Sequence, residues 1–268
     1  MSINPTSLST GSINQFNQVQ NRLDESNKQL SSGQRINNAA VDPAGLQVFL
    51  QLQGQVIGDN TAIRNSLDGV SALQIADGSV NQVNDSLQQI RELSIQAQNG
   101  TLNDNDRASL QKQADALLEG IRDTIDQSTF NGQSLLAEDG ELRLQTGPGS
   151  EDSQNVGTFD VAGTLEDIGL FSLDITDSSA LDLLDESQDF LSSVSSEIGA
   201  NQNRLESTIN TLTESSLNQA EAASRIGDTD YAKAISERSA ALIQQEVGIA
   251  IQAQANANRG LVLNLLGS

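Results

Sequence analysis

The side chains of this chain that could carry out chemistry are almost all carboxylates and hydroxyls. The 268 residues include no histidine and no cysteine, so catalysis would need paired carboxylates, a hydroxyl, a lysine or the single tyrosine, Tyr231. Adjacent carboxylates occur at Glu151-Asp152 and Glu166-Asp167, from which a glycosidase acid–base pair could in principle be built. Both pairs lie in polar stretches without a surrounding apolar pattern, so we interpret them as solvated surface charge.

Metal and nucleic-acid sites are equally hard to build from these residues. The run Glu138-Asp139-Gly140-Glu141 is acidic, but its spacing misses the alternating ligands of a calcium loop, so we interpret it as a turn. The chain has 36 acidic and 14 basic residues, for a net charge of −22, and it lacks a Lys/Arg cluster that would neutralise phosphates. We therefore predict no catalysis, no cofactor, no metal site and no nucleic-acid partner.

The N-terminal sequence does not have the pattern of a cleaved leader. No Lys or Arg precedes Arg22, and no continuous apolar stretch follows the first residue, so we expect no cleaved signal peptide. No window of the chain approaches the ~20 apolar residues of a membrane span. We therefore expect no membrane insertion.

Apolar residues recur at helical spacing in the first forty residues. They form a heptad-like stripe that ends before Gly33 and consists of Ile13, Phe16, Val19, Leu23 and Leu30. Asp42-Pro43 then has the form of an N-cap followed by proline at the first helical position. We interpret residues 1–44 as an N-terminal core helix with a connecting segment.

The middle of the chain, residues 45–226, is predicted to be a rod domain built on three long helices. These helices span about residues 44–99, 104–129 and 181–226, with Asn99-Gly100 as a stop and Asn103 or Asp104 as a cap. At 1.5 Å per residue the first would be roughly 80 Å long, which is too long for a compact domain. The residues expected to pack in the rod are Ile63, Leu67, Val70, Leu87, Ile90, Leu93, Leu117, Ile121, Leu191, Val194, Ile198, Leu205, Ile209 and Leu212.

A change of period between the second and third of these helices predicts a β-hairpin over about residues 140–162. Glu141–Gln145 alternates polar and apolar residues, Gly147-Pro148-Gly149 has turn chemistry, and Thr158–Val161 would supply the return strand. Residues 138–189 hold fourteen acidic residues and one basic residue. We expect this part to be solvated and rich in loops.

The last segment, residues 227–268, is predicted to be a C-terminal core helix. Its apolar positions complete an assembly seam with the N-terminal stripe, and they are Tyr231, Ile235, Leu242, Ile249, Leu263 and Leu266. The predicted fold class is therefore mainly α. We expect a long antiparallel helical coiled-coil rod with a small β-hairpin and with the N- and C-terminal helices paired at one end.

The two ends differ from the rest of the chain in charge. Residues 1–44 have a net charge of zero and residues 227–268 of −1, which leaves −21 of the total −22 for the stretch between them. Ends that are neutral, helically periodic and only weakly apolar are typical of segments that become ordered by packing against copies of themselves. The same stripes would also close an intramolecular bundle, and the two interpretations are compatible. We expect the pair to be disordered in the monomer, because one stripe cannot offset the ordering entropy of ~80 residues.

Six short motifs, three in each half of the chain, resemble motifs of bacterial flagellins. They are Leu30–Asn37 (LSSGQRIN), Arg91–Thr101 (RELSIQAQNGT), Phe130–Gly132 (FNG), Asn203–Leu205 (NRL), Ser224–Tyr231 (SRIGDTDY) and Ala253–Asn256 (AQAN). The resemblance covers residues 1–136 and about 195–268, in the family's order. The chain is similar to a minimal flagellin, with core and rod domains and no outer domains.

This resemblance implies an extracellular filament subunit, a homopolymer for swimming motility whose terminal helices form an inner tube. It also implies export through the flagellum's own channel and contacts with an export chaperone and with junction and cap proteins. A hook–filament junction protein and a secreted helical adhesin remain as alternatives.

The resemblance also bears on detection by the animal flagellin receptor. In recognised relatives an Arg, a Leu and a Glu on the rod helices are central, and the matching positions here are Gln89, Leu93 and Gln113. Two of the three are lost, so we predict weak or absent receptor activation. A reporter-cell assay with pure protein tests this, and strong signalling would refute it.

Overall fold

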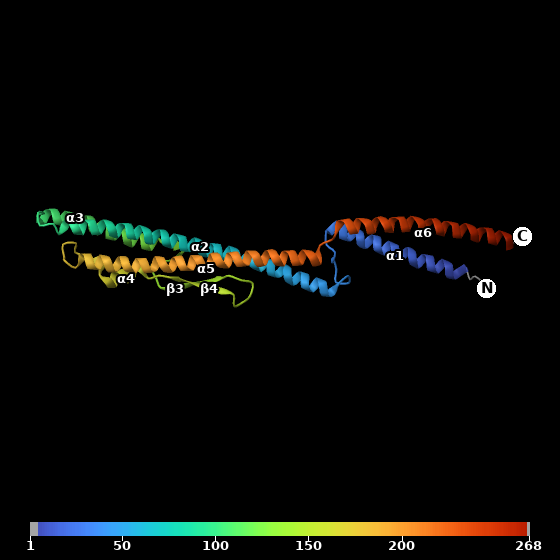
Figure 1. Ribbon diagram of the computed structural model, residues 1–268, viewed down its shortest axis with the longest axis horizontal. Helices are drawn as coiled ribbons and strands as arrows, with labels where there is room; N and C mark the ends of the chain where they lie inside the picture. Colours follow the sequence, from blue (N-terminus) through green and yellow to red (C-terminus); the bar gives the residue numbers. More distant parts are fainter. Residues whose placement is uncertain (1–4, 267–268) are drawn as a thin grey trace. The chain divides into compact units, whose positions relative to one another are not determined.

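The chain is mainly helical, as predicted. The computed structural model describes the backbone of residues 5–266 and the side chains of residues 14–258. The elements in chain order are α1 (Pro5–Ser32), α2 (Pro43–Ala97), α3 (Asp104–Gln127), β1 (Thr129–Phe130), β2 (Gln133–Ser134), β3 (Gly140–Gln145), β4 (Ser153–Thr158), α4 (Val161–Ile168), the 3₁₀ turn η1 (Leu170–Ser172), α5 (Ala180–Gly227) and α6 (Tyr231–Leu266) (Figure 1).

The chain forms two compact units. Unit 1 consists of Met1–Gly54 and Asn218–Ser268, and unit 2 of Gln55–Leu217. Unit 1 therefore includes the first turns of α2 and the last turns of α5, in addition to the two terminal segments at residues 1–44 and 227–268.

Local side-chain chemistry sets the helix ends. The Asp42 carboxylate accepts a hydrogen bond from the Gly45 N–H (2.9 Å) and caps α2. Asn103 caps α3 through a reciprocal pair of bonds with Asp106. Gly33 follows α1 with φ +70°, a conformation that costs glycine little. The helix α2 then continues through 55 residues without a break.

The prediction that α3 continues to about residue 129 is wrong by two residues. The helix ends at Gln127 because Thr129–Phe130 pairs with Gln133–Ser134 in a small antiparallel hairpin. Its two turn residues, Asn131 and Gly132, both have positive φ (51° and 81°), as a tight two-residue turn requires.

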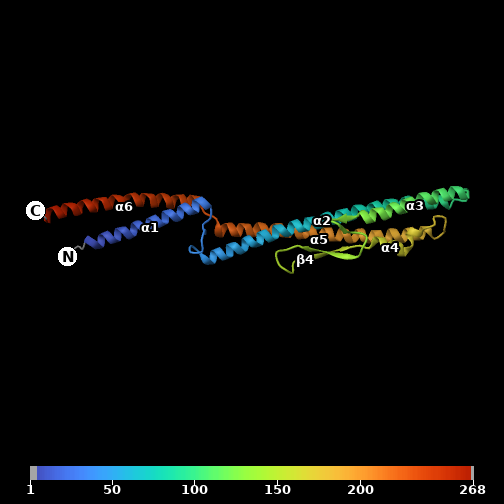
Figure 2. The ribbon, with the colours of Figure 1, turned by 180° about the vertical axis from the view of Figure 1, so that it is seen from behind.

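The core of unit 2 lies where α2, α3 and α5 run alongside one another (Figures 1 and 2). Eight of the residues expected to pack here are buried, namely Leu87, Ile90, Ile121, Leu191, Val194, Ile198, Leu205 and Leu212. Five more are half-buried, namely Ile63, Val70, Leu93, Leu117 and Ile209. Leu67 is a wrong prediction, because it is 49% exposed while Ser66 and Gly69 occupy the inward positions of that turn.

The β3–β4 hairpin packs along one face of α2. Pro148 in its turn approaches Gly58 so closely that an added Cβ on the glycine would lie 2.7 Å from the proline Cβ. Three helical turns later, an added Cβ on Gly69 would overlap Leu144 of β3. Between the two glycines, the Asn65 side chain donates to the Gln145 carbonyl (3.0 Å). Glycine is therefore required where the hairpin touches the helix.

The hairpin is shorter than predicted. Gly140–Gln145 pairs with Ser153–Thr158 in antiparallel register. The return strand therefore ends at Thr158, the residue at which the predicted return strand begins. The strand stops there because Asp160 accepts a hydrogen bond from the Gly163 N–H (2.7 Å) and caps α4.

The expectation that residues 138–189 are a solvated, loop-rich region is wrong. Leu165 of α4, Leu170 of η1 and Ile175 are fully buried in the core of unit 2. Gln111 of α3 holds the segment after η1, since it donates to the Leu173 carbonyl (2.9 Å) and accepts from the Ile175 N–H (3.0 Å). The acidic side chains occupy the opposite, solvated side of this segment. Hydrogen bonds from Thr176 lower the pKa of the Asp174 carboxyl.

We predict opposite effects of alanine at two glycines of α2. Gly69→Ala should lower the free energy of unfolding by about 1–3 kcal/mol, because the new methyl overlaps Leu144 and the hairpin must shift. Gly78→Ala, where nothing lies within 4 Å, should raise it by about 0.5–1 kcal/mol. Urea unfolding followed by circular dichroism measures both, and equal effects would contradict the close packing at Gly69.

Candidate assembly interface

The terminal helices α1 and α6 form an antiparallel pair within unit 1 (Figures 1 and 2). Among the side chains that the structure describes, the buried apolar seam between them consists of Val19 and Leu23 from α1 and Ala241 from α6. A hydrogen bond from Gln245 to Gln20 (2.8 Å) joins the helices beside this seam. In its described part, the pair thus buries one narrow apolar stripe.

The N-terminal stripe expected from the sequence lies largely in this seam. Val19 and Leu23 are 4% and 5% exposed, and Leu30 is half-buried. Phe16 lies at the edge of the seam and is 36% exposed. The side chains of Ile13, Leu263 and Leu266 lie outside the described residues.

Four of the six predicted C-terminal seam positions are wrong as intramolecular contacts with α1. Tyr231, Ile235, Leu242 and Ile249 are 53%, 53%, 38% and 55% exposed. The positions that face α1 are one residue earlier, at Ala234 (3%) and Ala241 (4%). Alanine lets the two helices approach closely, so the larger side chains of the adjacent heptad stripe point away from α1.

A second apolar stripe on α6 was not predicted. Ile243, Val247 and Ile251 are 62%, 51% and 58% exposed and follow one another at intervals of four residues, which places them on one side of the helix. Together with Phe16 and Val19 of α1 they line a groove of about 190 Å³ between the helices. The i, i+4, i+8 spacing is a sequence signal that could have revealed this stripe.

The exposed side chains of α6 therefore form two flanks on either side of its alanine ridge. We call Ile235, Leu242 and Ile249 the heptad flank, and Ile243, Val247 and Ile251 the groove flank. At ~100° per residue, neighbouring members of the two flanks are separated by roughly 100–160° around the helix axis. Large exposed apolar surfaces of this kind mark sites of association.

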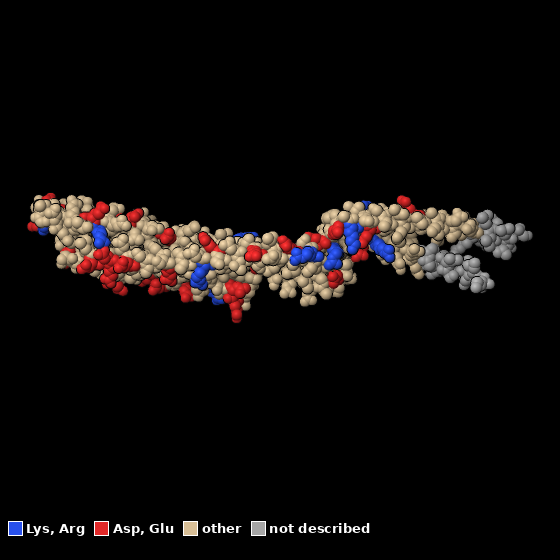
Figure 3. Space-filling model, viewed as in Figure 1, with Lys and Arg blue, Asp and Glu red and all other residues tan. Residues whose placement is uncertain are grey.

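Charge is distributed very unevenly between the two units. Unit 1 contains seven basic and eight acidic residues, a net charge of −1, so unit 2 has the remaining −21. Figure 3 shows basic and acidic side chains interleaved around the start of α6 and acidic side chains gathered over α4. Copies of unit 1 can therefore approach one another with little electrostatic repulsion.

The groups considered for catalysis or metal binding are not gathered into a site. Glu151, Asp152, Glu166 and Asp167 are exposed, and Tyr231 is 53% exposed. Within the described part of the chain, His, Cys, Asp and Glu form no group suited to hold a metal ion. The described helices also include none that is long and apolar enough to cross a membrane.

The three positions that the family resemblance assigns to the receptor contact lie on helices of unit 2. Gln89 and Leu93 are on α2 and Gln113 is on α3. Both glutamines are exposed and Leu93 is half-buried, so the prediction of weak receptor activation concerns an accessible surface.

The chain is similar to bacterial flagellins over most of its length. Residues 3–140 match the bacterial flagellin N-terminal helical region, and residues 181–266 match the bacterial flagellin C-terminal helical region. A flagellin of Halalkalibacterium halodurans is 38% identical over 89% of this chain and 90% of its own length. A flagellin of Bacillus subtilis is 32% identical over 99% of this chain and 100% of its own length.

A solved structure also shares the fold. It is from Vibrio parahaemolyticus, is named as a flagellar hook-associated protein, and is 14% identical over 70% of this chain and 100% of its own, with a TM-score of 0.59. At this identity the likeness concerns the fold alone.

We predict that polar substitution in the heptad flank weakens self-association without unfolding α6. Ile249→Ser should reduce the association constant about tenfold or more, because an isoleucine contributes roughly 1.5–3 kcal/mol when it is fully buried. Ala250→Ser is the matched control, since residue 250 is also exposed and adjacent. Sedimentation velocity measures association, and circular dichroism checks helix content. Equal effects of the two substitutions would contradict this role of the heptad flank.

Proposed function

The chain belongs to the bacterial flagellin family and is a structural subunit of the flagellar filament, and we propose that its copies polymerise through the two exposed flanks of α6. The observation that supports this route most directly is the exposure of six large apolar side chains on α6 although this helix is paired with α1. In a polymer these side chains would be buried against neighbouring copies.

The position of the flanks favours an open assembly over a closed dimer. A two-fold dimer uses one self-complementary patch, whereas contacts between different patches add copies without closing. The heptad flank and the groove flank lie on different sides of α6, so each would meet a different neighbour. Such contacts generate a helical filament with the α1/α6 pairs at its centre.

The acidic unit 2 would then lie on the outside of the filament. Its net charge of −21 is tolerated where water and counterions surround it, and it opposes close approach at low salt. The filament would transmit rotation to the surrounding fluid, and shifts between two packings of unit 2 would change its helical shape. We further propose as partners the flagellar export apparatus, an export chaperone, and the junction and cap proteins at the two filament ends.

A hook–filament junction protein is the second candidate function, because a hook-associated protein shares the fold. The two functions differ in the number of copies that assemble. A filament subunit adds indefinitely, whereas a junction protein forms a short layer.

We predict long uniform filaments when the purified protein is polymerised and viewed by electron microscopy. Filament yield should rise as salt is raised from ~0.01 M to ~0.15 M, because the screening length falls from about 30 Å to about 8 Å. Only short assemblies would favour the junction protein. The absence of assembly at every salt concentration would refute both candidates.

A further inference from the structure

Two chain links lie side by side within unit 1. The first connects α1 to α2 through residues 33–42, and the second connects α5 to α6 through residues 228–230. They pair through an antiparallel bridge between Gln34 and Asp228. Backbone bonds flank this bridge on both sides, from the Arg35 N–H to the Gly227 carbonyl (2.7 Å) and from the Thr229 N–H to the Gly33 carbonyl (2.9 Å).

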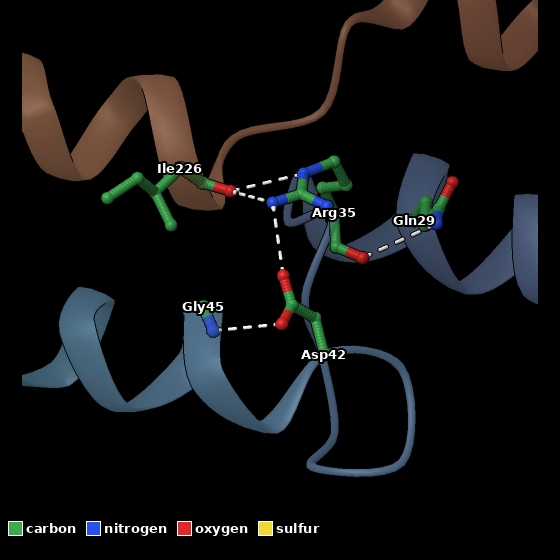
Figure 4. A network of polar contacts seen from close by, with 5 residues as sticks. All are labelled: Gln29, Arg35, Asp42, Gly45 and Ile226. Carbon is green, nitrogen blue, oxygen red and sulfur yellow. Dashed lines mark hydrogen bonds and ion pairs between the residues drawn. The ribbon is translucent and has the colours of Figure 1, made fainter.

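Arg35 fastens the first link to the end of α5 (Figure 4). Its guanidinium donates from Nε (3.1 Å) and from Nη2 (2.6 Å) to the Ile226 carbonyl. The last carbonyls of a helix have no partner within the helix, and they carry the negative end of its dipole. A cation placed here therefore makes charge-assisted bonds to groups that would otherwise need water.

The same residue also contacts the helices on either side of its own link. The Gln29 side chain on α1 donates to the Arg35 carbonyl (3.3 Å). Nη2 lies 3.9 Å from one oxygen of Asp42, whose other oxygen caps α2 at Gly45 (Figure 4). Arg35 is thus in contact with α1, α5 and the residue that caps α2.

The contacts of Arg35 differ in strength. The Arg35 and Asp42 side chains are 45% and 37% exposed, so their ion pair is screened by water and contributes little. The two bonds to Ile226 and the backbone bond to Gly227 carry most of the attachment. Nearby, the Phe49 ring of α2 packs directly on Gly227, where an added Cβ would overlap it.

We propose that Arg35 is a positioning residue that holds the α1/α6 pair in one orientation relative to the first turns of α2 and the last turns of α5. Without its guanidinium, the link would keep the buried Ile36 side chain and the backbone bond to Gly227 but would lose its charge-assisted bonds to the end of α5. The α1/α6 pair would then adopt a wider range of orientations. Assembly needs the flanks of α6 in a single orientation, and pre-organisation lowers the entropy cost of binding. This inference rests on the proposed polymerisation through α6 and assigns the residue that sets its geometry.

The chain has no cysteine, so an introduced pair reports on the two links without background. We call the double variant Gln34→Cys, Asp228→Cys the parent variant. Its two thiols lie at directly opposed positions of the antiparallel bridge. The rate of disulfide formation in the monomer then measures how much of the time the links lie together.

We expect Arg35→Ala to slow disulfide formation in the parent about tenfold, and Arg35→Lys to slow it less, because lysine keeps the charge but not the fork of donors. Asp42→Asn keeps the cap of α2 and should change the rate less than twofold. Arg225→Ala is the matched control, because it also removes one positive charge and Arg225 lies next to Ile226 in the last turn of α5. Its ion pair in the structure is with the exposed Glu221 (3.6 Å). An unchanged rate in Arg35→Ala would overturn the proposal.

A second experiment distinguishes whether Arg35 positions the α1/α6 pair or contacts a neighbouring copy directly, by asking whether the disulfide restores filament formation. The Arg35→Ala variant of the parent should form few filaments when reduced, and its yield should return to the parent's once the disulfide locks the links. If the locked variant remains defective while the locked parent assembles, Arg35 does not act by positioning. Failure of the unmodified protein to form filaments would instead contradict the proposed function, and the rates in the monomer would still decide the role of Arg35.

Discussion

A helix that packs against one partner can bury only one of its faces, and α6 has apolar side chains on more than one. Its inner ridge consists of Ala234 and Ala241, which bring α1 close but contribute little apolar area. The large side chains of the heptad flank and the groove flank remain exposed as a result. Their burial is therefore left to contacts with other copies, and the proposed polymer follows from this constraint.

The two units meet opposite physical requirements. Unit 2 has a continuous apolar core formed by α2, α3, α4, α5 and the hairpin, and it has a net charge of −21 that water can solvate. Unit 1 has a small seam and a net charge of −1, which suits crowding around a common axis. Both long helices, α2 and α5, contribute residues to each unit.

Features fixed by local chemistry could be predicted from the sequence. The caps at Asp42 and Asn103, the stop at Gly33 and the strong periodicity of α5 depend on neighbouring residues alone. The inward face of α6 could not be predicted from the sequence. Ala234 and Ala241 repeat every seven residues, as do Ile235 and Leu242, so the period alone does not show which stripe packs against α1. In the structure the alanines are buried against α1, although we expected the larger apolar residues to lie inside. The short helix α4 was missed for a similar reason, since its eight residues are too few for a clear period.

Amide hydrogen exchange, compared between monomer and filament, tests most directly whether the flanks of α6 are the assembly surface. Backbone amides exchange slowly where structure is stable and quickly where it opens. If the flanks of α6 are the assembly surface, protection of α1 and α6 should rise strongly on assembly, whereas protection of the unit 2 core should change little. Equal protection of α6 in monomer and filament, with the large change confined to unit 2, would contradict this role of the flanks.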